Sequence, residues 1–202
     1  MIRRPPRSTH CISSAASDVY KRQMHELQNL MHQLITGGYE TTQSAINHGM
    51  WALIRFPDIA EKIYEDESLL KPFIEEVLRW ESPVQFLLRR TSKDVEVSGT
   101  VIPKDSMVMM GYGPANRDEE KFSCPHQFQL NREGVGAHMA FGSGAHHCPG
   151  ALLGRQEMIR SFKFLVQRMK NIKIDKPLQE PVHNFSMFFM PMKEFFITFD
   201  KR

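Results

Sequence analysis

The sequence is short of cysteine, of excess charge and of long apolar runs. Its three cysteines, Cys11, Cys124 and Cys148, form no Cys-x-x-Cys pair and fit a reducing compartment better than a disulfide framework. The formal net charge of +3 comes from scattered Lys and Arg, which argues against a nucleic-acid-binding protein. No apolar run approaches the ~18 residues of a membrane span, so we expect no membrane segment.

The composition fits a folded chain, but the first 23 residues differ from the rest. Hydrophobic residues make up 41% of the 202 positions, enough to bury a sizeable core in one domain or one large fragment. The opening stretch is rich in Arg, Ser and Pro and has no apolar periodicity; a transit peptide is one reading. It also resembles translated adapter read-through at the edge of a gene fragment. We therefore interpret residues 1–23 as non-native and residues 24–202 as a partial domain that begins inside a gene.

Apolar spacing predicts three helical regions. Residues 25–55 keep a helical period on both sides of "TGGYETTQS", whose glycines and threonines predict a local distortion there. Pro57 ends that helix and Asp58 begins a short one. A third helix is predicted over residues 68–81, because Pro83 follows.

The second half of the chain mixes strands, a long loop and one helix. Alternating and β-prone runs over residues 84–111 predict a small sheet. Residues 112–147 predict a long ordered loop with short helical turns, a kind of loop that is usually functional. Helical spacing returns from Pro149 to about Lys170, and the final "EFFITF" predicts a strand. The fold class is thus mainly α with a small β component.

The stretch "FGSGAHHCPG", residues 141–150, carries the most specific motif. Pro149 is favoured at the first position of a helix, which places Cys148 at or near the N-cap. Helix N-termini carry unpaired N–H groups and a positive partial charge that stabilise a thiolate. Read alone, a lone cysteine after a Gly-rich turn is more often a buried structural residue.

The same stretch resembles the haem-binding loop of the cytochrome P-450 family. In that family the cysteine thiolate is the axial ligand of haem iron, and this resemblance assigns the role to Cys148. It also implies that His146 contacts a haem propionate, whereas His147 is read as an exposed loop residue. The pattern Phe-x-x-Gly-x-x-x-Cys-x-Gly is matched by Phe141, Gly144, Cys148 and Gly150.

A second motif, "EEVLR" at residues 75–79, matches the family's Glu-x-x-Arg helix. Glu76 and Arg79 lie three apart and so share one helix face; an exposed ion pair is the plain reading. The resemblance instead implies a buried bidentate pair that clamps the loop beneath the haem. It also places a third contact near "CPHQF", where Gln127 stands in place of an arginine. Arg117 in "ANRD" is expected to support the fold.

A third motif, "GGYETT" at residues 37–42, resembles the family's oxygen-activating helix segment. Gly37 and Gly38 would leave room for dioxygen over the iron. Thr41 would donate a hydrogen bond to bound oxygen, and Glu40 would help to relay protons from solvent. Taken alone, the pattern predicts only a kink.

The resemblance also suggests residues for the haem edge and the substrate side. Arg89 stands where bacterial members place an arginine for a haem propionate, and Arg90 is the adjacent alternative. Two apolar runs could line the substrate side or simply pack in the core. These runs are Val84, Phe86, Leu87 and Leu88 in the middle of the chain, and Met187 and Phe188 near its end.

Together the motifs resemble, in order, the C-terminal half of a cytochrome P-450 over residues 25–199. This implies a haem-thiolate monooxygenase with heme b that inserts one oxygen atom from O2 into an apolar organic substrate. A ferredoxin or flavoprotein would supply electrons, docking where Arg155, Arg160 and Lys163 offer positive charge. The bacterial style of the motifs implies a cytoplasmic enzyme.

Two alternatives stay open. The first is a zinc-binding module that uses Cys148, His146, His147 and His138, although adjacent histidines do not easily face one tetrahedral ion. The second is an inactive fragment that does not bind haem, because part of the cofactor pocket is missing.

Overall fold

The computed structural model describes residues 24–175, 180–184 and 186–202. Helices and four two-stranded antiparallel sheets make up this part of the chain, which confirms the mainly α class with a small β component. Residues 1–23, interpreted above as non-native, lie outside the described residues. The helices are α2 (Met24–Arg55), α3 (Pro57–Glu65), α4 (Leu70–Trp80), α5 (Tyr112–Ala115) and α6 (Ala151–Val166), with short 3-10 helices η1 (Glu67–Leu69), η2 (Val135–Ala137) and η3 (Gly144–His146).

The chain divides into two compact units, residues 1–39 and 40–202, and the boundary falls inside α2. The predicted distortion of this helix is wrong, because α2 is helical without a break from Met24 to Arg55. The Thr36 hydroxyl donates to the His32 carbonyl, one turn back along the helix, at 2.7 Å. Such a bond satisfies the hydroxyl within the helix.

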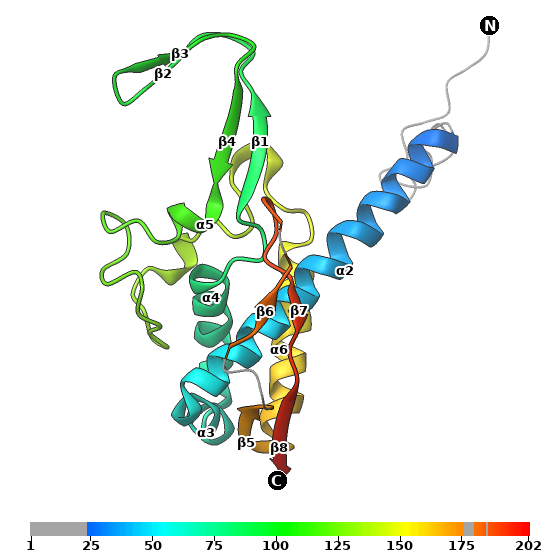
Figure 1. Ribbon diagram of the computed structural model, residues 1–202, viewed down its shortest axis with the longest axis vertical. Helices are drawn as coiled ribbons and strands as arrows, with labels where there is room; N and C mark the ends of the chain where they lie inside the picture. The colour runs from blue at the N-terminus through cyan, green and yellow to red at the C-terminus, as the bar shows by residue number, and fades with distance from the viewer. Residues whose placement is uncertain (1–23, 176–179, 185) are drawn as a thin grey trace, which may run out of the picture. The chain divides into compact units, whose positions relative to one another are not determined.

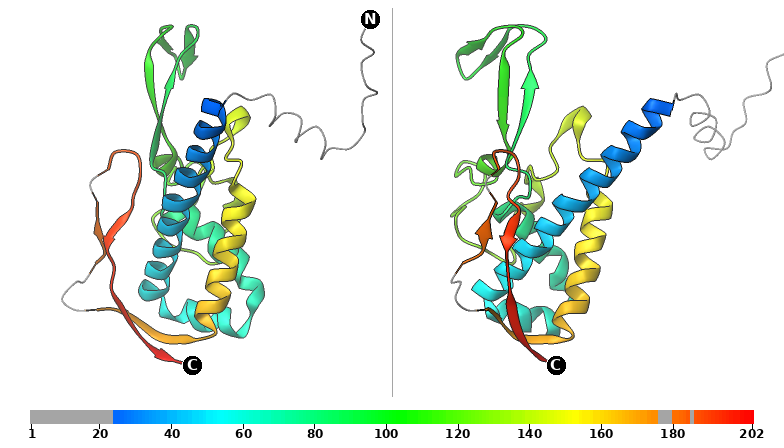
Figure 2. Two further views of the ribbon diagram at one scale, coloured as in Figure 1. Left: turned by 90° about the vertical axis from the view of Figure 1, so that its right-hand side faces the viewer. Right: turned by 45° about the vertical axis from the view of Figure 1, so that its right-hand side comes forward.

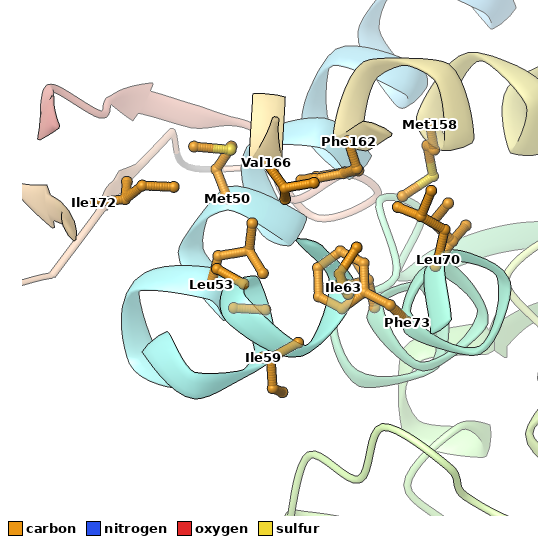
Figure 3. Packing of buried hydrophobic residues seen from close by; sticks show 14 of the residues in the cluster. Met50, Leu53, Ile59, Ile63, Leu70, Phe73, Met158, Phe162, Val166 and Ile172 are labelled. Atoms are coloured by element: carbon orange, nitrogen blue, oxygen red, sulfur yellow. The ribbon is translucent and has the colours of Figure 1, made fainter. Parts of the chain in front are cut away.

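The core of the second unit lies where α2, α3, α4 and α6 meet (Figure 3). The rings of Phe73 and Phe162 cross edge to face, with centroids 5.1 Å apart. Gly49 lets α2 approach α6 closely, since a Cβ at this position would lie 2.3 Å from the Phe162 ring. Figure 2 shows α6 running beside the second half of α2. The largest buried apolar side chains include Leu53, Ile63, Phe73, Ile74, Met158 and Phe162.

The predicted small sheet over residues 84–111 is two antiparallel strand pairs, and the inner pair lies between the two strands of the outer pair in sequence (Figure 1). The first strand pairs antiparallel with the fourth, from Phe86 opposite Gly111 to Arg90 opposite Met107. The second and third pair around Gly99, whose φ of +77° favours glycine. The strands are β1 (Phe86–Arg90), β2 (Val95–Val97), β3 (Thr100–Ile102) and β4 (Met107–Gly111).

The tail adds two more strand pairs, β5 with β8 and β6 with β7. The predicted final strand is present, although it begins at Ile197 rather than at the start of "EFFITF". Within the described ranges, no helix is both long and apolar enough to cross a bilayer. The strands are β5 (Met169–Ile174), β6 (Val182–His183), β7 (Met192–Glu194) and β8 (Ile197–Lys201).

Candidate cofactor site around Cys148

The predicted loop between α5 and α6 presents Cys148 on a tightly folded turn. The Cys148 N–H donates to the Phe141 carbonyl at 2.9 Å, which folds the stretch back on itself. Gly142 and Gly144 both have φ of +68°, a conformation that residues with a side chain rarely adopt. Cys148 is a free, half-buried thiol. The glycines of the motif therefore set the fold of the loop that carries the sulfur.

The predicted start of the following helix is wrong by two residues. Helix α6 begins at Ala151 and its N-cap is Gly150, so Cys148 precedes the cap instead of occupying it. Pro149 and Gly150 form a turn, and the Ala151 N–H donates to the Cys148 carbonyl at 3.3 Å. The sulfur still lies beside the helix N-terminus, 3.8 Å from where a Cβ on Gly150 would be.

The Glu-x-x-Arg pair on α4 is fully buried. Arg79 Nε and Nη2 donate to the two carboxylate oxygens of Glu76, each at 2.7 Å. The remaining guanidinium protons reach three loop carbonyls, at 3.0 Å on Asn116, 2.8 Å on Pro125 and 3.1 Å on Gln127. This is the bidentate geometry implied by the resemblance, and it ties α4 to the irregular segment 116–127.

The third member of this network is Arg132, so the assignment of that position to Gln127 is wrong. Arg132 Nε donates to both oxygens of Glu76, at 3.0 and 3.1 Å. Gln127 contributes only its backbone carbonyl, which accepts from Arg132 Nη2 at 2.7 Å. The sequence held a signal for this: besides Arg117, Arg132 is the one arginine in the stretch 112–147.

Arg117 bonds to the end of α4. Its Nη2 donates to the Trp80 carbonyl at 2.6 Å and to Glu81 Oε1 at 3.0 Å. Burial raises the pKa of Glu81, and the nearby Arg117 charge only partly offsets this effect.

A second buried ion cluster, missed in the sequence, joins α4 to α6. Glu75 accepts two bonds from Arg155, at 2.6 and 3.0 Å, and one from His138 Nε2 at 2.9 Å. Burial alone would raise the pKa of Glu75, but the hydrogen bonds and charges of His138 and Arg155 outweigh it and lower the pKa to about 2. The Arg155 guanidinium also lies over the Phe141 ring, 4.4 Å from its centroid.

This cluster changes the predicted basic docking surface. Arg155 is neutralised by Glu75, and the exposed Lys163 pairs with Glu67 at 2.6 Å. Arg160 is exposed on the same helix. A partner surface on α6 would therefore rely on less free positive charge than the sequence predicts.

Arg89 and the cysteine loop approach one another through Tyr112. Arg89 Nη2 lies 3.5 Å from the Tyr112 hydroxyl, and that hydroxyl lies 3.7 Å from where a Cβ on Gly142 would be. Arg90, the alternative, is exposed and pairs with Asp105 at 3.4 Å. Of the two arginines, Arg89 is the one near the cysteine loop.

Thr42 of α2 lies near the first turn of α6. A Cβ on Gly154 would lie 4.0 Å from Thr42 Oγ1 and 4.0 Å from the Phe141 ring. Thr41 is half-buried and Glu40 is exposed on the same helix. Gly37 and Gly38 are exposed residues of the first unit.

The two apolar runs, far apart in sequence, lie side by side. Val84 and Phe189 form an antiparallel bridge, and the Gln85 N–H donates to the Phe188 carbonyl at 2.8 Å. Phe86 and Leu87 continue into β1. Most of these side chains are half-buried, whereas Met187 is 56% exposed.

The four residues considered above for a zinc site do not form a metal-binding cluster. Among the described residues, no group of three or more His, Cys, Asp or Glu side chains could hold a metal ion. His138 faces Glu75, while His146 and His147 are exposed.

The arrangement does fit a haem. Cys148 is a free thiol whose deprotonated form is the soft anionic donor that haem-thiolate iron requires, and it lies on a loop bent by glycines. A guanidinium suited to a carboxylate lies near that loop through Tyr112. Sulfur and guanidinium are thus available for the iron and for a propionate.

Comparison with known proteins points the same way. The family model described as cytochrome P-450 matches residues 9–199. Cytochrome P-450 CYP107DY1 of Priestia megaterium is 36% identical over 162 residues, which cover 80% of this chain and 39% of that protein. A methyl-branched lipid omega-hydroxylase of Mycobacterium bovis is 34% identical over 192 residues, 94% of this chain and 44% of that protein.

A solved structure shares the fold. The substrate-free cytochrome P-450 CYP150A6 of Mycobacterium marinum matches with a TM-score of 0.80 at 36% identity, over 83% of this chain and 43% of that one. The chain therefore spans less than half the length of these relatives.

Proposed function

Because the chain belongs to the cytochrome P-450 family, we propose that it forms the haem-binding part of a haem-thiolate monooxygenase. One observation carries the proposal: a free, half-buried Cys148 on a loop folded by Gly142 and Gly144 and bonded back to Phe141. Bound heme b would supply the activation of O2 for the insertion of one oxygen atom into an organic substrate.

The chain's own residues would bind and orient the haem. Cys148 would be its thiolate ligand. Arg89 and His146 would hold the carboxylates, and Phe141, Gly144 and Gly150 would shape the surface under the macrocycle. The buried network of Glu76 and Arg79, completed by Arg132, would hold the neighbouring loop in place.

Residues of α2 would handle protons. The exposed Glu40 carboxylate can exchange protons with solvent, and the half-buried Thr41 hydroxyl can pass them inward. Gly37 and Gly38 would leave space for O2.

The substrate would be apolar and small. Val84, Phe86, Leu87, Met187 and Phe188 would line its side, and the contact between the two runs supports this. One relative is named as a lipid hydroxylase, which agrees with an apolar substrate. Electrons would come from a ferredoxin or flavoprotein, and the resemblance to bacterial relatives supports a cytoplasmic location.

The proposal is tested by adding haem to the purified chain and recording the reduced carbon-monoxide spectrum. The expected result is the shifted Soret band of a thiolate complex, which Cys148→Ala abolishes and Cys124→Ala leaves intact, since Cys124 is the other described free cysteine. A band that survives Cys148→Ala would refute the role of this sulfur.

The share of the relatives that this chain spans favours one alternative, an inactive fragment that does not retain haem. In that case the chain alone gives no band. The same pair of substitutions in a gene completed upstream then decides the role of Cys148.

A further inference from the structure

The Glu75 cluster lies next to the cysteine loop and has no role in the function proposed above. Glu75 is 8% exposed and His138 is 7% exposed, yet the cluster holds a carboxylate, a guanidinium and an imidazole. Burying charged groups costs free energy of desolvation, and this cost is offset only where the charges are paired and hydrogen-bonded in good geometry. Both Glu75 oxygens are bonded, so the pairing is complete.

The Glu75 cluster contacts both ends of the segment 138–141, which precedes Cys148. His138 Nδ1 accepts from the Ala140 N–H at 3.2 Å, which leaves its Nε2–H to donate to Glu75. Arg155, from α6, covers the Phe141 ring. The Phe141 carbonyl in turn accepts from the Cys148 N–H. An unbroken chain of contacts therefore runs from Glu75 to the backbone of Cys148.

A further buried side chain holds the same segment from the end of α5. Asn116 is fully buried, and its Oδ1 accepts from the Met139 N–H while its Nδ2 donates to Ser82 Oγ at 2.6 Å. The Met139 carbonyl accepts from the Gly142 N–H at 2.8 Å. The protein's own side chains thus bond the segment 138–142 on two sides.

From these contacts we infer that Glu75, with His138 and Arg155, is a positioning cluster that fixes the Cys148 loop before the cofactor binds. Sites work best when their supporting residues are already in place. The inference rests on the proposed role of Cys148, but it concerns the cofactor-free chain and can be measured there.

The test is the rate at which iodoacetamide alkylates Cys148 in a Cys11→Ser, Cys124→Ser background without haem. Glu75→Gln keeps the shape of the side chain but removes its charge, so the loop opens more often. The expected result is an increase of roughly five-fold or more, the factor that corresponds to a small loss of local stability. Arg155→Lys, which keeps the charge, should restore part of the protection relative to Arg155→Ala.

Two controls separate positioning from general stability. Glu67→Gln removes another ion pair between α6 and the preceding helices, that with Lys163, and should leave the rate within roughly two-fold. Gly49→Ala strains the core away from the loop, so it should lower the melting temperature without a comparable rise in the rate.

The inference is overturned if Glu75→Gln leaves the rate of Cys148 alkylation unchanged. It is also overturned if Gly49→Ala, at matched stability, raises this rate as much as Glu75→Gln does. If Glu75→Gln does not fold, the comparison of Arg155→Lys with Arg155→Ala decides, and equal rates in these two variants overturn the inference. Haem binding by Glu67→Gln is recorded separately, so a failure of the proposed function is distinguished from a failure of this cluster.

Discussion

Two buried titratable side chains, Glu75 and His48, make stability depend on pH in two adjacent ranges. Glu75 is ionised in the folded chain because its pKa is held at about 2, below the usual 4.5. Its stabilising contribution is therefore complete above pH 4.5 and is lost as the pH falls through about 2.

For Glu75 we expect Glu75→Gln to lower the free energy of unfolding near neutral pH by up to about 3 kcal/mol. The same variant should flatten the loss of stability between pH 4.5 and 2. Denaturant unfolding at several pH values measures both effects. Glu67→Gln is the matched control, and a similar flattening in that variant would contradict the prediction.

His48 acts at higher pH. Its Nδ1 lies 2.9 Å from the Glu81 carbonyl and its Nε2 lies 2.9 Å from the Met190 carbonyl. Burial outweighs these two contacts and lowers the pKa of His48 to about 4, so the ring is neutral and can donate to one carbonyl at a time. Acid must force a charge into this site, which destabilises the fold.

The prediction for His48 follows from the depressed pKa. Stability should be full above pH 6.5 and fall by up to about 3 kcal/mol as the pH drops through about 4. His48→Gln cannot take the proton, and its stability should change little over this range. The control is His126→Gln, at an exposed position. Its free energy of unfolding should fall with pH as steeply as that of the wild type. If His48→Gln shows the same fall, His48 is not the cause.

At the residue scale the sequence predicted what is local. Glu76 and Arg79 share a helix turn, so their spacing alone placed them on one face. Arg132 and Glu75 could not be assigned in this way, because their partners lie across a long irregular loop and on another helix. The spacing of residues along the chain does not show which loop carbonyls and carboxylates will face one another.

At the scale of elements, two glycines lie where α2 and α6 meet, and their surroundings differ. A Cβ on Gly49 would overlap the buried Phe162 ring, whereas one on Gly154 would make ordinary contacts at 4.0 Å. Position 49 therefore has room only for glycine, whereas position 154 has room for a side chain.

Gly49→Ala should therefore destabilise the chain by about 1–3 kcal/mol, because overpacking outweighs the better helix propensity of alanine. Gly154→Ala should be neutral or stabilising by up to about 1 kcal/mol. Melting temperatures of both variants test the contrast. Equal effects would mean that the Phe162 ring moves aside freely.

Helical period and turn residues predicted the elements themselves, with errors at their ends. The distortion predicted in α2 is not seen, since the helix continues from Met24 to Arg55. The start of α6 lies at Ala151 because Pro149 and Gly150 form a turn before it. Both errors concern residues that are equally compatible with a helix or a turn, so the sequence alone could not decide.

At the scale of the whole molecule, α6 exposes apolar side chains next to the cysteine loop. Leu152 is 73% exposed and Leu153 is 63% exposed. Adjacent exposed leucines favour association with another apolar surface. The relatives that share this fold are more than twice as long as the matched region.

We predict that the chain self-associates and that Leu152→Gln with Leu153→Gln weakens this association roughly ten-fold or more, through loss of buried apolar area. Sedimentation velocity over a concentration series measures it. Phe196→Gln, at an exposed position in the C-terminal tail, serves as control and should change little. Association that is insensitive to both leucines would place the contact elsewhere.

The bridge between Val84 and Phe189 has a consequence for how such proteins diversify. Val84 follows α4, whereas Phe189 lies beyond the cysteine loop and α6. Exchange of the segment after α6 would thus alter one side of this contact while leaving the cysteine loop and its ion pairs unchanged. Chemistry and selectivity could then be inherited separately.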